Sequence, residues 1–373
     1  MKIAFLCSSL ETGRDGVGDY ARQLAAACAA RGHTCLLVSL RDPHLAATAE
    51  TAGELRLASS EPLGDRVAQL ERTLAAFSPD QVSWQFVSYG YHPKGLIGTE
   101  ARAFARCLAP RRPHVLLHEL WIGIDRHEPW RNRLIGALQR RGLLGWLSTL
   151  QPSVVATSNA TYGAVLARDG IAATVLPLFG NIPLVTADAA VLARHLPAGP
   201  RPTWLVAVSF GTLHPQWRPD ATAEFLTALA RRLGRSPVLV AVGRTGTHGA
   251  DILDQLREHG LPAVATGELP PAEISRVFQA ADLGLAPHPW ALIGKSGAAA
   301  ALLDHGLPVL VPRDDWTPRF ALPPAAPETD RLARLTDLTP DRAAAWLGRR
   351  CAPAPILPRV TAAFLATLVS QNA

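Results

Sequence analysis

Short apolar runs alternate with amphipathic helical patterns along the chain, and this alternation constrains the fold more than any other feature. Residues 2–9, 35–40 and 81–87 have the length and apolar character of strands buried on both faces. Residues 16–32 and 65–78 place apolar side chains at three- and four-residue intervals, as helices do. The pattern predicts an α/β protein in which parallel sheets are covered by helices.

The alternation occurs twice, which predicts two domains. The 373 residues exceed one ordinary core and suit domains of about 150 to 190 residues. We expect a first doubly wound, Rossmann-like domain at residues 1–185, and a Pro- and Gly-rich linker at 186–202. A second such domain is expected at 203–350. After the break "CAPAPILP", residues 351–373 are expected to form a helix that crosses back to the first domain.

Composition excludes some classes of protein. Apolar residues make up 48% and charged residues 18%, so the chain has ample material for a core. The net charge of +6 suits anionic partners such as nucleotides, phosphorylated sugars or acidic membrane surfaces, without choosing among them. No nucleic-acid partner is expected. Five cysteines without a C-x-x-C pair, and an N-terminal apolar run too short for a signal sequence, predict a cytoplasmic protein, with contact to the inner face of the membrane left open.

A Gly-Lys-Ser motif ends at Ser296, before a helix of small residues. A P-loop needs a glycine five positions before its Gly-Lys, and Pro289 stands there instead. We expect Ser296 to cap the helix, so that Gly297 and Ala298 present N–H groups to a diphosphate and Lys295 adds a charge. The alternative is a capped structural helix with a solvated lysine.

Two other strand-to-helix turns carry glycines or basic residues. Gly13, Gly16 and Gly18 follow the first strand and open the first helix, but their G-x-x-G-x-G spacing is not that of the dinucleotide fingerprint. Phosphate binding and a plain tight turn both remain open here. In the second domain, the turn after the first strand offers Gly211 and Arg218 to the same phosphates.

Several motifs together resemble a known family. The glycine-rich first turn before residues 24–38, the "HEL" at 118–120, "TGELPPAEISRVFQAADLGLAP" and "GLPVLV" are similar to GT-B glycosyltransferases, specifically the retaining family-4 type. The resemblance covers nearly the whole chain, and the last two motifs are its most specific part. It implies two Rossmann-like domains facing a cleft, a nucleotide-sugar donor, and a sugar or lipid-linked acceptor.

The resemblance also implies roles by position. His118 matches a histidine that contacts the transferred sugar, although a buried core histidine is the alternative. Glu119 is a candidate for orienting the acceptor, or a solvated carboxylate. The donor diphosphate and sugar are expected at Gly16, Val17, Gly18, Gly211, Arg218, Lys295, Ser296, Gly297 and Ala298. The base and ribose are expected at Gly243, Gly267, Glu268, Leu269 and Asp304.

The chain departs from the family pattern in its acidic and basic residues. Family members usually carry two glutamates around the phosphate-binding helix, and Ile293 and Ala301 occupy those positions. Asp304, one turn later, is the substitute for binding ribose, or a structural aspartate. Thr212 and Trp217 replace the usual basic pair, with Arg218 adjacent. A sugar-nucleotide epimerase and a non-catalytic binding subunit on the same architecture therefore remain as alternatives.

The expected chemistry is departure of a nucleoside diphosphate from an oxocarbenium-like sugar beside an acceptor hydroxyl. No H-E-x-x-H, D-x-D or clustered Cys/His pattern occurs, so we expect no metal and no cofactor, only a UDP- or GDP-linked substrate.

The acceptor region is expected in the first domain. Tyr89, Tyr91 and His92 lie in a loop after a strand and can stack on a sugar, or form an ordinary packed loop. Residues 130–150 place Trp130, Leu134 and Leu138 on one helix face with arginines elsewhere. This pattern is typical of a helix on a membrane surface, and equally of any helix that covers a parallel sheet.

Overall fold

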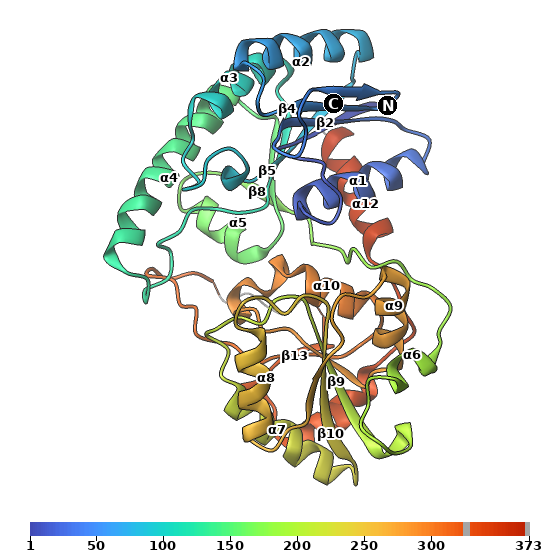
Figure 1. Ribbon diagram of the computed structural model, residues 1–373. Helices are drawn as coiled ribbons and strands as arrows, with labels where there is room; N and C mark the ends of the chain where they lie inside the picture. The colour runs from blue at the N-terminus through green and yellow to red at the C-terminus, as the bar shows by residue number, and fades with distance from the viewer. Residues whose placement is uncertain (324–328, 370–373) are drawn as a thin grey trace. The chain divides into compact units, whose positions relative to one another are not determined.

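The structure is a computed structural model that describes residues 1–323 and 329–369 (Figure 1). These residues form two compact units. The first contains residues 1–177, 317–323 and the described C-terminal residues from 357 onward, and the second contains 178–316 and the described part of 324–356. Each unit is built on its own largely parallel sheet, so the prediction of two α/β domains is confirmed.

The first unit has an eight-stranded sheet in the order β3-β4-β2-β1-β5-β6-β7-β8. All neighbouring strands are parallel except β3 and β4, which form an antiparallel hairpin. The strands are β1 (Lys2–Cys7), β2 (Thr34–Asp42), β3 (Ala49–Thr51), β4 (Glu54–Ala58), β5 (Gln81–Phe86), β6 (His114–Leu117), β7 (Val154–Thr157) and β8 (Ala173–Val175).

Helices cover both faces of this sheet (Figure 1). Helices α1 and α12 pack side by side on one face, and α2, α3 and α4 follow one another over the other. Their bounds are α1 (Gly16–Ala29), α2 (Leu63–Phe77), α3 (Thr99–Leu108), α4 (Trp130–Leu150), α5 (Ala160–Ala167) and α12 (Leu357–Val369). On its buried face, α4 contributes Trp146 to an aromatic group. Phe86 of β5 stacks on this ring, with the ring centroids 4.2 Å apart.

The second unit has a fully parallel six-stranded sheet in the order β11-β10-β9-β12-β13-β14. Its strands are β9 (Trp204–Phe210), β10 (Ser236–Val242), β11 (Ala263–Ala265), β12 (Leu283–Leu285), β13 (Val309–Val311) and β14 (Leu332–Arg334). Its helices are α6 (Ala189–Ala193), α7 (Pro219–Arg232), α8 (Gly249–Glu258), α9 (Pro271–Ala280), α10 (Gly297–Asp304) and α11 (Pro340–Trp346).

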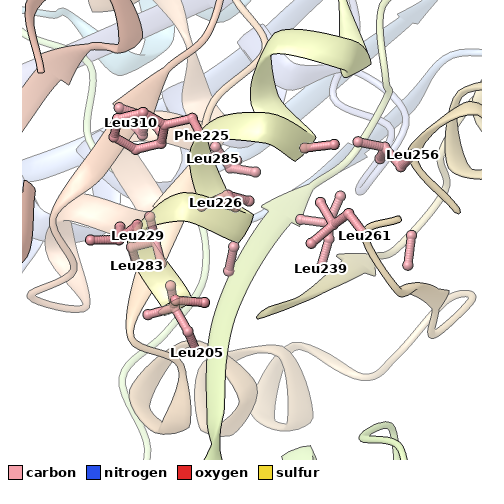
Figure 2. Close-up of a cluster of buried hydrophobic side chains, with 14 of the residues drawn as sticks. Leu205, Phe225, Leu226, Leu229, Leu239, Leu256, Leu261, Leu283, Leu285 and Leu310 are labelled. Carbon is pink, nitrogen blue, oxygen red and sulfur yellow. The ribbon is translucent and has the colours of Figure 1, made fainter. Parts of the chain in front are cut away.

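Leucines from the strands and from α7 and α8 form one buried cluster of the second unit (Figure 2). Leu205 of β9, Leu239 of β10 and Leu283 of β12 face Leu226 and Leu229 of α7. These side chains are at most 1% exposed. Burial of this kind contributes about 1.5 to 3 kcal/mol for each leucine, so the cluster fixes the helix on the sheet.

The passages between the units differ from the predicted boundaries. Residues 186–202 are not a linker: they belong to the second unit, where α6 packs against α9 and buries Val191 and Leu192. Residues 317–323, expected in the second domain, belong to the first unit, where the Arg126 N–H donates to the Thr317 carbonyl at 2.8 Å. Residues 351–356 belong to the second unit, and α12 packs in the first.

Candidate functional site

In the second unit, the N-terminus of α10 offers two open hydrogen-bond donors. Ser296 has an extended backbone (φ −86°, ψ 105°), and its buried hydroxyl accepts from the Ala299 N–H at 3.2 Å. This cap leaves the Gly297 and Ala298 N–H groups without a hydrogen-bond partner among the described residues. Both residues are partly exposed. Unpaired N–H groups and the positive end of the helix dipole together favour an anion.

Cationic and imidazole side chains gather around His288, which precedes this helix in the chain. Burial, followed by the charges of Lys295, Arg313 and His214, lowers the pKa of His288 to about 4. His288 follows β12, and Arg313 follows β13, so both lie where neighbouring parallel strands end. His288 is therefore a neutral hydrogen-bonding group at neutral pH, while Lys295 and Arg313 carry the positive charge.

Arg313 is held rigidly in this group. Its side chain is 5% exposed. The guanidinium makes a bidentate ion pair with Asp315 (3.1 and 2.7 Å) and donates to the Gln216 side-chain oxygen at 2.8 Å. Sequence reasoning missed both Arg313 and His288. Their signal was positional, because each follows an apolar strand at the edge where α/β proteins bind ligands.

The predicted base and ribose residues fall into two groups. Gly243 and Gly267 meet at the ends of β10 and β11, where the Gly243 N–H donates to the Gly267 carbonyl at 3.0 Å. Both have positive φ (83° and 69°), which explains why glycine stands there. Glu268 is exposed and 3.6 Å from Arg244, whereas Leu269 packs against the core.

Asp304 does not fit the predicted ribose contact. It is 4% exposed, and its carboxylate accepts from the Gly180 N–H at 3.0 Å and the Ile356 N–H at 3.1 Å. The aspartate therefore ties two distant chain segments to α10 and is structural. Gly180 also lies against the middle of this helix, since a Cβ on it would come within 2.6 Å of the Ala301 Cα. Ala301 is thus covered by the backbone at Gly180.

The turn after β9 contributes less than expected. Gly211 has a positive φ of 77° and open space around it. Arg218 is 81% exposed and pairs with Asp220 at 3.0 Å, so the structure does not hold it in a fixed orientation toward other predicted donor residues. Trp217 is buried, with its indole N–H donating to Thr222 at 2.9 Å.

In the first unit, Asp15 in the loop between β1 and α1 already caps the N-terminus of α1. The Asp15 carboxylate accepts from the Val17 N–H at 2.9 Å and the Gly18 N–H at 3.0 Å. Gly18 lies so close to the loop that a Cβ would be 2.4 Å from the Ser9 carbonyl oxygen, whereas Gly16 has open space around it. The predicted phosphate contact at Val17 and Gly18 is therefore not an open anion site, because a carboxylate occupies these donors.

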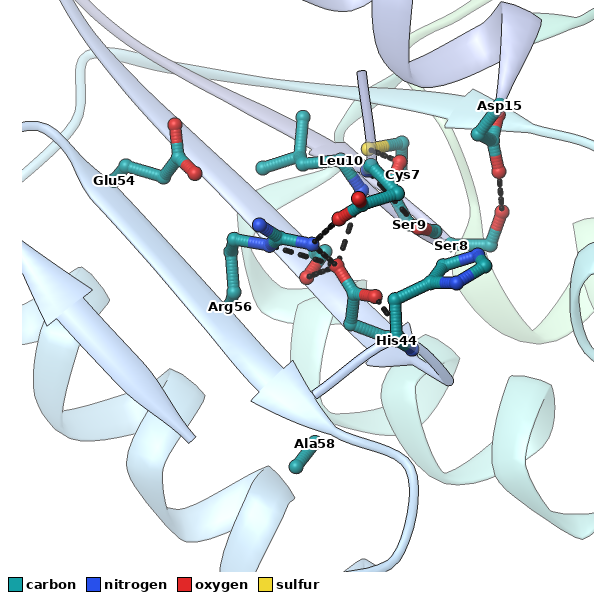
Figure 3. Close-up of polar contacts among 12 residues, drawn as sticks. Cys7, Ser8, Ser9, Leu10, Asp15, His44, Glu54, Arg56 and Ala58 are labelled. Carbon is teal, nitrogen blue, oxygen red and sulfur yellow. Dashed lines mark hydrogen bonds and ion pairs between the residues drawn. The ribbon is translucent and has the colours of Figure 1, made fainter. Parts of the chain in front are cut away.

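Acidic side chains outnumber basic ones around this loop. Arg56 bridges Glu11 at 2.7 Å and the buried Asp42 at 2.8 Å (Figure 3). Nearby, Arg22 pairs with Glu54. Although burial opposes ionisation of Asp42, hydrogen bonds from Arg56 and from two backbone N–H groups hold its pKa below the usual value. With Asp15 added, the negative charge suits sugar hydroxyls better than phosphates.

His118 ends a buried chain of hydrogen bonds that starts at His114. The His118 Nε2 lies 3.1 Å from the Gln85 side-chain oxygen, the Gln85 amide donates to Ser83 at 2.7 Å, and Ser83 lies 3.0 Å from His114 Nδ1. The network assigns the Nε2–H tautomer to His118, which leaves Nδ1 as an acceptor. Burial lowers the pKa of His118 to about 4, so the ring is neutral at neutral pH. Its edge contacts Tyr20, with ring centroids 4.9 Å apart.

The other predicted residues of the first unit are brought together only in part. Tyr91 is wrong as an acceptor contact: it is buried, stacks on Phe86, and accepts from the Trp84 indole at 2.9 Å. Tyr89 is 37% exposed. The His92 ring accepts from the Lys94 N–H at 3.1 Å. Glu119 lines a small cavity beside α4.

No helix in the described part of the chain has the length and apolar character needed to span a membrane. No group of three or more His, Cys, Asp or Glu side chains within residues 1–323 and 329–369 is arranged to hold a metal ion.

No protein-family model matches the sequence, and no curated protein matches it either. Solved structures do match. The chain is similar to HepE of Anabaena in complex with UDP (TM-score 0.53, 16% identity, covering 99% of this chain and 100% of HepE). It is also similar to the UDP-GlcNAc 2-epimerase of Methanocaldococcus jannaschii, with a TM-score of 0.53 and 11% identity, covering 99% of this chain and 100% of the epimerase. A third match is the catalytic domain of starch synthase IV of Arabidopsis thaliana bound to ADP and acarbose. Its TM-score is 0.54 and its identity 10%, and the match covers 100% of this chain and 99% of that domain.

These similarities extend over nearly the whole chain, and at such low identities they show the fold alone. The fold is GT-B, with two Rossmann-like parallel-sheet domains.

Proposed function

We propose that this protein is a glycosyltransferase that moves a sugar, with retention, from a nucleoside diphosphate sugar to a hydroxyl of a sugar or lipid-linked acceptor. The observation that carries the proposal is the N-terminus of α10. There, two unpaired N–H groups, of Gly297 and Ala298, lie in the same unit as a group of cationic and imidazole side chains that includes Lys295 and Arg313. The bound nucleotides in the HepE and starch synthase structures agree with a nucleotide ligand.

The α10 site supplies what a leaving diphosphate needs. As the bond to the anomeric carbon breaks, negative charge grows on the phosphate oxygen. The Gly297 and Ala298 N–H groups donate to these oxygens, and Lys295 offsets the charge. Arg313 adds a fixed positive charge because Asp315 and Gln216 already orient it. His288, neutral at neutral pH, is a further hydrogen-bond donor.

The sugar and the acceptor are assigned to the first unit. His118 accepts a hydrogen bond from a substrate hydroxyl at Nδ1, because its Nε2–H is committed to Gln85. The acidic surroundings of Asp15 and Gly16 favour a neutral polyol there. Glu119, Tyr89 and His92 are the residues we assign to the acceptor side.

A sugar-nucleotide epimerase is the second candidate, favoured by the similarity to the UDP-GlcNAc 2-epimerase. Epimerisation requires acid and base groups that act on the sugar carbons. The two positions where the resembled family carries glutamates are Ile293 and Ala301 here, and Asp304 is tied to backbone N–H groups. We therefore rank transfer above epimerisation.

Incubation with UDP- and GDP-linked hexoses, without acceptor, separates these functions. We expect slow release of free nucleotide, monitored by chromatography, and this result supports a transferase. Conversion of the donor into a different sugar nucleotide would assign the epimerase. Absence of nucleotide binding by calorimetry would assign a non-catalytic subunit and overturn the proposal.

A further inference from the structure

Helix α4 carries three large apolar side chains on its outer surface, all in its N-terminal half. Trp130, Leu134 and Leu138 are 64%, 58% and 60% exposed, more than any other large apolar side chain in the described part of the chain. They recur every four residues, so they form one stripe about 12 Å long. A helix that merely covers a sheet would bury these residues.

Contacts on the opposite face hold α4 in this orientation. Gly136 faces inward against the Ile122 carbonyl oxygen, which a Cβ would approach to 1.8 Å. One turn later, the buried Gln139 accepts from the Ile122 N–H at 2.9 Å and donates to the Lys94 carbonyl at 2.7 Å. Small and polar residues therefore line the inner face at these turns, and the stripe remains outside.

The stripe is surrounded by positive charge. Residues 130–150 contain no acidic side chain. Arg131 stacks on Trp130 with its guanidinium carbon 5.7 Å from the ring centroid, and Arg141 follows Leu138 by one turn. Helix α3, which packs beside α4, adds the exposed Arg102 and Arg106 (Figure 1). None of these arginines makes an ion pair within residues 1–323 and 329–369.

An apolar groove of about 580 Å³ joins the two helices. Its walls are apolar or small residues and three of the same arginines: Leu96, Ile97, Arg102, Arg106, Leu138, Arg141, Gly142, Gly145, Trp146 and Thr149. We call Trp130, Leu134, Leu138, this groove and Arg131 together the α4 surface.

We propose that the α4 surface binds an anionic phospholipid bilayer, with α4 lying in the plane of the interface. The apolar stripe enters the boundary between headgroups and acyl chains, where tryptophan is favoured. The guanidinium groups bind lipid phosphates, which planar arginine forks match well. Charge complementarity favours an anionic bilayer over other partners. The surface combines exposed apolar area with arginines that make no ion pair in the described part of the chain, and α4 has no acidic side chain to neutralise their charge.

The same charges argue against self-association. A twofold dimer would place each α4 surface against its own copy and bring like charges together. The proposal does not rest on sugar transfer, so its test uses lipid binding alone.

The test is flotation of the full chain with vesicles of phosphatidylcholine, alone or with about 30 mol% phosphatidylglycerol. We expect binding only to the anionic vesicles, and weaker binding in about 0.5 M NaCl, which screens the charges. The variant R102Q/R141Q should lower the partition coefficient about 25-fold, since each arginine near such a surface contributes about fivefold. The variant W130S/L134S/L138S should lose detectable binding.

The control variant R231Q/R359Q removes the same charge from exposed arginines on α7 and α12, and should bind within about twofold of the parent. Failure of the parent to bind anionic vesicles would overturn the proposal, as would equal losses in the control and R102Q/R141Q. A dimer in sedimentation velocity that W130S/L134S/L138S abolishes, without vesicle binding, would assign the α4 surface to a second copy of the chain and also overturn it.

Discussion

Lys295 is one of only three lysines, and it directly precedes the capped N-terminus of α10. If α10 holds the diphosphate, Lys295→Ala removes a charge-assisted contact worth about 1.5 to 3 kcal/mol. Affinity for UDP or GDP should then fall about ten- to a hundredfold, measured by calorimetry. Thermal stability should change little because the side chain is partly exposed.

The matched control is Lys2→Ala, which alters a lysine at the start of β1 in the first unit. It should leave nucleotide affinity unchanged. Equal affinities of the parent and Lys295→Ala would remove the reason for placing the donor at this helix.

Individual residues were predictable where their partners are local. Ser296 caps α10 through a residue three positions on, so the sequence motif was sufficient. Asp304 was ambiguous because its partners, Gly180 and Ile356, are separated from it by 124 and 52 positions. Arg313 was not predicted because its role depends on which strands are neighbours in the sheet, and the sequence of one strand does not show this. Tyr91 looked like a loop residue, but its hydroxyl pairs with a buried indole.

At the scale of elements, the long central strands and helices were predicted from periodicity, but the edge strands β3 and β14 were not. Strands β3 and β14 have three residues each and carry little apolar signal. Helix α4 was predicted with its full extent, yet periodicity alone did not say which face is buried. Gly136 and Gln139 decided this, through close backbone contacts that no apolar pattern records.

The hydrogen bonds that join Asp304 of α10 to the segments at Gly180 and Ile356 give a prediction about how these elements are held together. In Asp304→Asn, an amide NH2 group replaces one of the two carboxylate oxygens. This NH2 group then faces a backbone N–H, and neither group can accept a hydrogen bond from the other. The free energy of unfolding should fall by about 1 to 3 kcal/mol, measured by urea denaturation, because a buried group loses its partner. UDP and GDP affinity should stay within about twofold, because the carboxylate serves structure.

The control is Asp341→Asn, which changes a side chain that is 80% exposed and should shift stability by less than about 0.5 kcal/mol. A large loss of nucleotide affinity with unchanged stability in Asp304→Asn would restore the ribose contact.

At the scale of the whole molecule, the number of domains was predictable but the passages between them were not. The doubled strand pattern predicted two sheets. The Pro- and Gly-rich stretch at 186–202 resembled a linker by composition, yet Val191 and Leu192 within it are buried in the second unit. Residues 317–323 belong to the first unit through backbone hydrogen bonds, which depend on conformation more than on residue type.

The assignment of α12 to the first unit yields the last prediction. Phe364 of α12 is fully buried and contacts Phe5 and His114, with ring centroids 5.5 and 5.2 Å away. Phe364→Ala should cost about 3 to 5 kcal/mol, and hydrogen exchange should speed up in β1 and β6 while β9 and β10 keep their protection. The reciprocal variant, Phe278→Ala, removes a fully buried ring of the second unit and should give the opposite pattern. Equal loss of protection in both units from either variant would mean that the two cores unfold as one, and would contradict their independence.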